Sequence, residues 1–173
     1  MQLGYSDWEP FQTTEPIVVT RFIDTTGFSR TSTGSDFLRI DATLPAALYG
    51  KALAFAGFQM CYGTNTGNSI TDVEVEEDVQ TSSGSGGSSS VASDSTTRTD
   101  AACRTYSPAS PIPLTSSNQF GLFVIGNWTT ANTDLFMGRV TAILQPTSTA
   151  ASASHAAGRA GSASHNPGVG LSR

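Results

Sequence analysis

The chain has 173 residues, a formal net charge of −5 and only 13% charged residues. Such a length fits one domain with tails, and a composition rich in Ser, Thr, Gly and Ala favours β-structure over long surface helices. A single lysine, Lys51, and no basic patch argue against nucleic acid as a partner, and no apolar run approaches the roughly 20 residues that insert across a membrane.

The first half of the chain predicts strands after an aromatic-containing lead-in at 1–14. Short apolar runs bounded by turn residues are typical of strands, and a turn of helix ended by Gly50 is expected at 44–51. Alternation in the third run places Phe55 on one face and Phe58 on the other, as expected for an antiparallel sheet. The predicted strands are 16–23, 36–43, 52–63 and 68–79.

The stretch 81–100 is rich in Ser and Gly and is predicted to be a long flexible loop inside one domain, 15–146. The residues after it are too few to form a core alone, whereas a long loop adds little closure entropy. We therefore expect the segments on both sides of the loop to share one hydrophobic interior.

The second half predicts three more strands, at 101–107, 119–128 and 134–144. The proline-rich segment 107–114 should be extended without ladder pairing, and the Ala/Ser/Gly-rich tail 147–173 should be disordered. The fold class predicted is all-β: an antiparallel, jelly-roll-like β-sandwich.

The two cysteines, Cys61 and Cys103, lie in strands on either side of the Ser/Gly stretch. They are either buried free thiols or a disulfide, which would stabilise a loop of this size by about 4 kcal/mol. A disulfide implies an extracellular, cell-surface or virion location, although the N-terminus "MQLGYSDWEP" has no recognisable signal peptide.

Catalytic chemistry has little support in the sequence. Both histidines, His155 and His165, lie in the predicted tail, so neither a histidine-based triad nor a histidine metal site is expected. The acidic residues Asp72, Glu74 and Glu76 alternate along a predicted strand. They are interpreted first as a solvated face, next as a Ca²⁺ site, and last as catalytic carboxylates.

Exposed aromatic residues could bind a ligand. Trp8, Tyr62 and Trp128 are candidates for a sugar-stacking surface of the kind that β-sandwich lectins use. The alternative, packing in the core and between the sheets, is favoured.

The succession "FQMCYGTNTGNSITDVEVEE", a Ser-rich loop, "TRTDAACRTYSP" and "FGLFVIGNWTTANTDLFMGRVTAILQP" resembles jelly-roll-type β-sandwich domains of bacteria and phages. These domains form fibre heads and surface or capsid-associated proteins. The resemblance covers about residues 36–146 and implies a structural or adhesive module that oligomerises, with a trimer as one expected state. It transfers no site residue.

The main hypothesis is therefore a non-enzymatic assembly module that associates with copies of itself. The strand at 119–128 is apolar on both faces, which suggests a partner surface. The residues predicted for self-association are Phe120, Leu122, Phe123, Val124 and Ile125. The alternative function is carbohydrate binding, and an acid-based hydrolase is a distant third.

Overall fold

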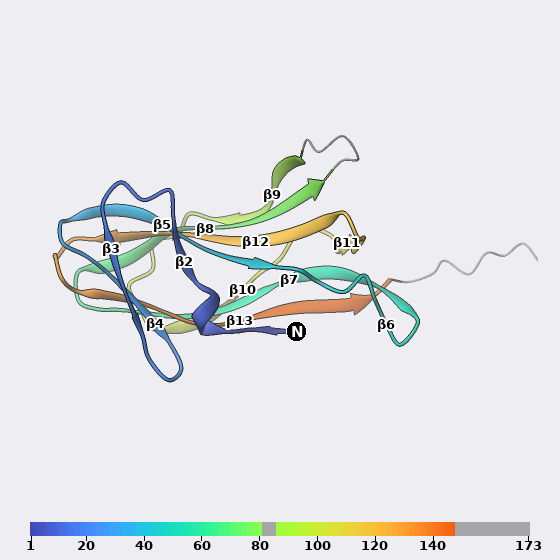
Figure 1. Ribbon diagram of the computed structural model, residues 1–173, viewed down its shortest axis with the longest axis horizontal. Helices are drawn as coiled ribbons and strands as arrows, with labels where there is room; N and C mark the ends of the chain where they lie inside the picture. Colours follow the sequence, from blue (N-terminus) through green and yellow to red (C-terminus); the bar gives the residue numbers. More distant parts are fainter. Residues whose placement is uncertain (81–85, 148–173) are drawn as a thin grey trace, which may run out of the picture.

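The computed structural model describes residues 1–80 and 86–147 as a sandwich of two antiparallel sheets (Figure 1). The larger sheet follows the order β10-β7-β13-β4-β3, and three short strands pair with β7 or β13 at its margins. Its strands are β1 (Gln2–Leu3), β3 (Ile17–Arg21), β4 (Thr26–Arg30), β6 (Ala47–Leu48), β7 (Lys51–Thr64), β10 (Ala102–Tyr106), β11 (Ile112–Pro113) and β13 (Asp134–Pro146). The predicted all-β sandwich is confirmed.

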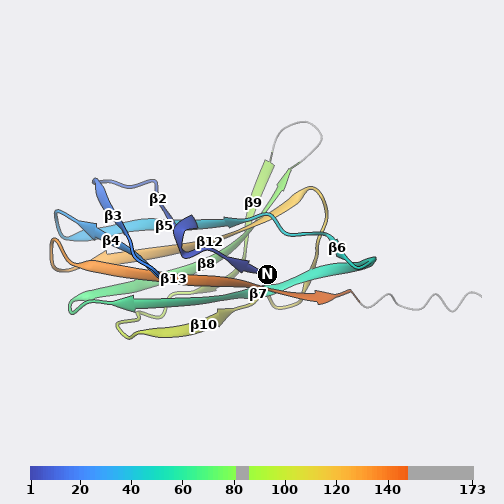
Figure 2. The same cartoon turned by 60° about the horizontal axis from the view of Figure 1, so that its bottom comes forward.

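The smaller sheet follows the order β2-β5-β12-β8-β9. Its strands are β2 (Glu9–Phe11), β5 (Gly34–Ala42), β8 (Asn68–Gln80), β9 (Gly86–Asp94) and β12 (Asn118–Trp128). The only described helix is one short turn, η1 (Tyr5–Asp7). Figure 2 shows the two layers from a second direction, and the tips of β8 and β9 rise away from the body of the sandwich in both views.

The two halves of the chain interleave in both sheets. Strand β13 lies between β7 and β4, and β12 lies between β5 and β8, so each of these late strands has early strands on both sides. Their inner faces meet in one hydrophobic core, in which Phe55 stacks on Phe120 with ring centroids 4.1 Å apart. The expected common interior is observed.

Strand β7 departs from simple alternation at Gly57. The register between β7 and β13 shifts beside this residue, which has a φ of +139°. The shift places both Phe55 and Phe58 in the core, each with no exposed surface, although the sequence pattern put them on opposite faces. A β-bulge adds one residue to a strand and changes which face the following side chains take.

The predicted helical turn at 44–51 is wrong. Residues Tyr49 and Gly50 have φ of +49° and +74° and form a two-residue turn between β6 and β7, where Leu48 pairs with Lys51. Positive φ at both central positions is the requirement of a type I′ hairpin turn, which a Gly in the second position favours. Gly50 therefore reverses the chain instead of ending a helix.

Three stretches that were predicted to lie outside the sheets contribute strands. In the proline-rich segment 107–114, which was predicted to lack ladder pairing, β11 pairs with β7. In the lead-in, β1 pairs with β13 and β2 pairs with β5. Within the predicted loop 81–100, β9 pairs with β8 from Val73 to Gln80. Ser and Gly have low strand propensity, but the exposed backbone edge of β8 gives them hydrogen-bond partners. The predicted tail lies outside the described residues apart from Thr147.

Candidate functional site

A groove with a volume of about 380 Å³ lies on the outer face of the smaller sheet. The cross-strand register builds it, because residues paired across neighbouring antiparallel strands project from the same face. One row across the sheet is Phe37, Ile125 and Asp72, and the next is Arg39, Phe123 and Glu74. The lining residues are Phe11, Gln12, Phe37, Arg39, Asp72, Glu74, Glu76, Asp78, Ser88, Phe123 and Ile125.

One side of the groove is aromatic, and two of its rings pack against the guanidinium of Arg39. The rings of Phe11 and Phe123 meet edge to face with centroids 5.4 Å apart. The Arg39 guanidinium lies 4.9 Å from the centroid of Phe11 and 4.8 Å from that of Phe123, close enough for cation–π attraction to both rings. Phe123 is nearly covered, at 8% exposed, whereas Phe37 beside it is 39% exposed.

Acidic partners fix the position of Arg39. Its Nε lies 2.6 Å from Oδ1 of Asp41, and one terminal nitrogen lies 3.6 Å from Oδ2 of Asp78. A planar guanidinium held by carboxylates has little freedom to turn. Arg39 therefore holds β2 and its Phe11 against the sheet, and it is the only basic side chain among the described residues that line the groove.

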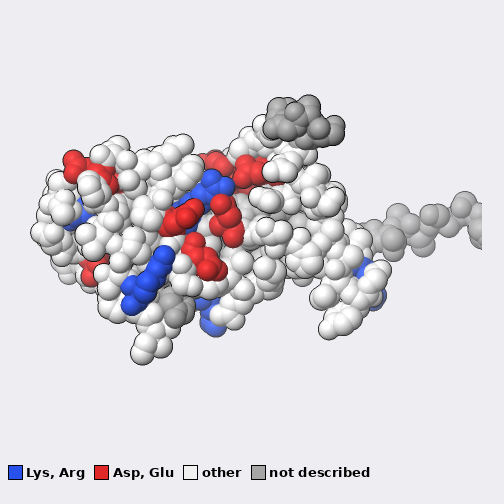
Figure 3. Space-filling view, viewed as in Figure 1, with Lys and Arg blue, Asp and Glu red and all other residues white. Residues whose placement is uncertain are grey.

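The other side of the groove is a line of carboxylates on β8. Asp72, Glu74, Glu76 and Asp78 follow one another at two-residue intervals, so all four project from the outer face. The Ser88 hydroxyl on β9 donates to Glu76 over 2.7 Å. Figure 3 shows acidic side chains gathered around a basic one over the middle of this side of the molecule.

Two of these carboxylates are not satisfied by the protein. Within residues 1–80 and 86–147, neither Asp72 nor Glu74 has a hydrogen-bond or ion-pair partner. Both are partly buried. Gly121, opposite Glu76 on the floor, adds no side chain, and a Cβ there would come within 3.0 Å of both Phe123 and Asp41.

The structure does not bring Trp8, Tyr62 and Trp128 together on an exposed surface, so the predicted stacking platform is corrected. Both tryptophans are in the core with no exposed surface, and their indole N–H groups donate to the carbonyls of Gly138 and Phe28, each over 3.0 Å. Core packing, the favoured alternative, accounts for them.

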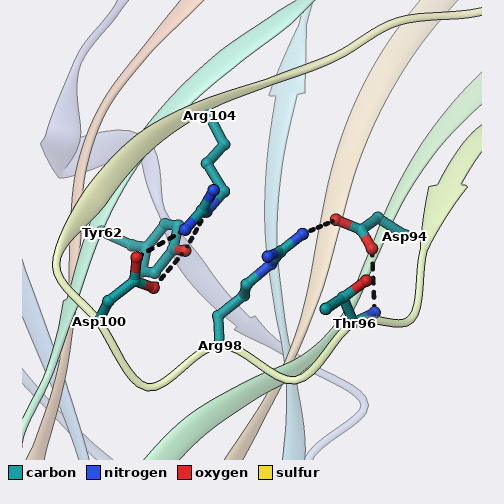
Figure 4. A network of polar contacts seen from close by, with 6 residues as sticks. All are labelled: Tyr62, Asp94, Thr96, Arg98, Asp100 and Arg104. Carbon is teal, nitrogen blue, oxygen red and sulfur yellow. Dashed lines mark hydrogen bonds and ion pairs between the residues drawn. The ribbon is translucent and has the colours of Figure 1, made fainter.

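Tyr62 is 5% exposed and belongs to a polar network on the far sheet (Figure 4). Its hydroxyl donates to Asp100 over 2.9 Å and accepts from Arg104 over 2.7 Å. Burial raises the pKa of Tyr62. The pKa of Asp100 is lowered, mainly by the hydrogen bond that Tyr62 donates to it. This network ties the segment before β10 to β7, which is a structural role.

A neighbouring pair in the same figure fixes the turn after β9. Arg98 donates to Oδ2 of Asp94 over 2.8 Å, and the Thr96 amide donates to Oδ1 over 2.9 Å. Hydrogen bonds from Thr96 and Arg98 lower the pKa of Asp94 to about 2. Burial raises the pKa of the adjacent Tyr106 to about 12.

A Ca²⁺ site was the second interpretation of the acidic residues on β8, after a solvated face. Asp72, Glu74 and Glu76 line one groove, but no group of three or more Asp, Glu, His or Cys side chains in the described part of the chain is arranged to hold a metal ion. Residues two apart on a strand are spaced by about 6.6–6.8 Å, too far for three such carboxylates to converge readily on one ion. His155 and His165 lie outside the described residues.

The predicted self-association residues divide between two faces of β12. Phe120, Leu122 and Val124 are fully buried in the core and cannot contact another copy. Phe123 and Ile125 point into the groove, where Phe11 and Arg39 cover Phe123. Contacts within one chain therefore account for both apolar faces of β12, the one in the core and the one in the groove. The homo-oligomer stays a prediction.

The cysteines form a disulfide between Cys61 on β7 and Cys103 on β10. They are directly opposed in the register, with Cα atoms 4.0 Å apart. Of the two alternatives that the sequence left open, the disulfide is present.

The sequence predicted no site role for Phe11, Phe37 and Arg39. The segment "DFLRID" nevertheless carries a signal, because Leu38 and Ile40 alternate with Phe37 and Arg39. An aromatic side chain on the polar face of a half-buried strand marks a surface that can bind apolar groups.

No protein-family model and no curated protein sequence matches this chain. Among solved structures, it is similar to the xylan-binding domain CBM22-2 of Paenibacillus barcinonensis Xyn10C, with 13% identity, a TM-score of 0.43, and coverage of 85% of this chain and 99% of that domain. It is also similar to the CBM22-1–GH10 part of Clostridium thermocellum endo-1,4-beta-D-xylanase 10B complexed with xylohexaose, with 11% identity and a TM-score of 0.48 over 84% of this chain and 27% of that one.

The tandem CBM22-1–CBM22-2 domain of Paenibacillus barcinonensis Xyn10C gives 16% identity and a TM-score of 0.43 over 85% of this chain and 50% of that one. At these values the likeness defines neither a family nor a site. The resemblance to bacterial and phage domains holds only at the level of a β-sandwich. The described residues include no helix with the length and apolar character that a membrane span needs.

Proposed function

We propose that this protein is a non-catalytic carbohydrate-binding module whose ligand lies in the groove of the smaller sheet. The observation that carries the proposal is the pairing of an aromatic side, Phe11, Phe37 and Phe123, with a carboxylate side on β8 in one groove. A sugar ring has an apolar C–H face that packs on aromatic rings and an edge of hydroxyl donors, and ionised carboxylates accept such donors.

The preorganisation of the groove supports the same proposal. Arg39 holds the aromatic side in place before any ligand arrives, which lowers the entropy cost of binding. The disulfide supports a location outside the cytosol, in an oxidising environment.

The test is binding to a panel of soluble and insoluble polysaccharides, with a matched pair of phenylalanine variants. Phe37 lines the groove and is 39% exposed, while Phe22 is 43% exposed and contacts Phe136 outside the groove. Phe37→Ala should weaken binding by about tenfold, the effect of losing one ring contact, and Phe22→Ala should leave it unchanged.

Both variants should keep the circular dichroism spectrum of the parent protein because neither side chain is in the core. Failure of the parent protein to bind any polysaccharide would contradict the proposal, and so would equal losses in the two variants.

A further inference from the structure

The charges around the groove are unbalanced. Four carboxylates on β8 line it, and within residues 1–80 and 86–147 the guanidinium of Arg39 is the only positive group that lines it. That guanidinium is already engaged by Asp41, by Asp78 and by the two phenylalanine rings. No lining cation is therefore free to pair with an acidic sugar, and the groove disfavours uronic and sialic acids.

The two carboxylates that have no partner among the described residues lie beside the apolar floor. Asp72 is paired in the register with Ile125, and Glu74 is paired with Phe123. Side chains in directly opposed positions lie about 4.5–5.5 Å apart at Cβ. A sugar ring resting on Ile125 would thus present its edge substituents to Asp72, with Glu74 two residues further along the same face of β8.

Neutral hydroxyl groups would satisfy these carboxylates only in part. Asp72 and Glu74 are partly buried and carry like charges on the same face, and like charges close together raise each other's energy. An ammonium group donates hydrogen bonds and also removes the repulsion, and charge-assisted hydrogen bonds are about twice as strong as neutral ones.

We propose that the groove selects glycans that carry protonated amino groups, with Asp72 and Glu74 as the specificity-determining residues. This inference rests on the proposed carbohydrate-binding function and names its ligand class: polymers of deacetylated amino sugars. The aromatic side contacts the sugar ring, and the β8 carboxylates bind its protonated amino group.

The experiment compares three hexasaccharides by isothermal titration calorimetry at low ionic strength: hexaglucosamine, its N-acetylated counterpart and cellohexaose. Hexaglucosamine should bind about tenfold more tightly than the other two, as one charge-assisted contact predicts. The preference should decrease with added salt, because screening weakens exposed ion pairs.

The double variant D72N/E74Q should remove the preference, so that it binds hexaglucosamine no more tightly than cellohexaose. The matched control E15Q/D24N makes the same change in net charge at two exposed carboxylates that do not line the groove, and it should keep the preference. An equal loss in this control would show non-specific attraction and overturn the inference.

The outcomes separate the two proposals. If neutral hexasaccharides bind and Phe37→Ala weakens them, but hexaglucosamine is not preferred, only the selection by charge is wrong. If none of the three hexasaccharides or the polysaccharides binds, both proposals are wrong.

Discussion

Arg39 shows how a single side chain can organise a surface. Its guanidinium contacts two rings, on β2 and β12, and two carboxylates, Asp78 on β8 and Asp41 on its own strand. The acidic side of this surface was predicted from the sequence as a candidate site, whereas Phe11 and Phe37 on the aromatic side were not. Periodicity assigns a residue to a face, whereas the partner across the sheet depends on strand order, which one sequence does not contain.

The tryptophans also show that a single sequence does not reveal the partner of a side chain. Trp8 lies in the aromatic-containing lead-in and Trp128 lies at the end of a strand, and an exposed stacking surface was the less favoured alternative to core packing for both. Each indole N–H reaches a main-chain carbonyl that the fold brings near, Gly138 for one and Phe28 for the other. Those carbonyls are 130 and 100 residues away in the chain, so no local pattern could reveal them.

At low pH, Asp94 should determine part of the stability. Its pKa falls from 3.8 to about 2 on folding, so its ionised form is stabilising at pH values above about 4. That contribution is lost as the pH falls from about 4 to 2. It is at most about 2 kcal/mol, and solvent screening reduces it because the pair with Arg98 is about a quarter exposed.

The measurement is the melting temperature from pH 2 to pH 7 for the parent protein and Asp94→Asn. The variant should be less stable at pH 7 and should converge with the parent near pH 2. Curves separated by a constant amount at every pH would contradict this account.

At the scale of elements, the sequence predicts seven of the longer strands. It does not predict the bulge in β7, and it does not predict that a polar segment such as β9 pairs with a neighbouring strand. β9 is the clearest case, because its Ser and Gly residues predict a loop. Its pairing depends on the unpaired edge of β8, and its Val91 and Ala92 pack against the core. Tertiary context overrides weak local propensity at such edges.

The bulge in β7 gives a test at this scale. A Cβ on Gly57 would lie 2.5 Å from the Tyr106 carbonyl oxygen, at a φ that side-chain-bearing residues rarely adopt. Gly57→Ala should therefore cost about 2–4 kcal/mol in the free energy of unfolding, from strain and overpacking together.

The matched control is Gly63→Ala on the same strand, where the nearest atom would be 3.7 Å away on Ala101. Its free energy of unfolding should change by less than about 1 kcal/mol. Urea unfolding of both variants measures the difference, and similar losses would show that the bulge does not need glycine.

For the whole molecule, interleaving is the feature that the sequence predicts best. Neither half of the chain can bury its apolar residues alone, and the structure inserts β12 and β13 between strands of the first half. Which strands share a sheet could not be predicted, because the apolar runs fit either layer equally well.

The disulfide should contribute stability to the whole sandwich. It closes a loop with a sequence separation of 42, which restricts the unfolded chain by about 4 kcal/mol in the chain-entropy model. The double variant C61S/C103S should lose about that amount in urea unfolding, and a reducing agent should lower the stability of the parent but not of the variant. A parent protein that is insensitive to reduction would contradict this prediction.

The bond between Cys61 and Cys103 also determines what a protease would leave behind. A single cut anywhere between these residues would produce no smaller species on a non-reducing gel, because both fragments stay covalently joined. Two bands would appear only after the thiols are reduced, so a nicked molecule would keep its full mass until it entered a reducing compartment.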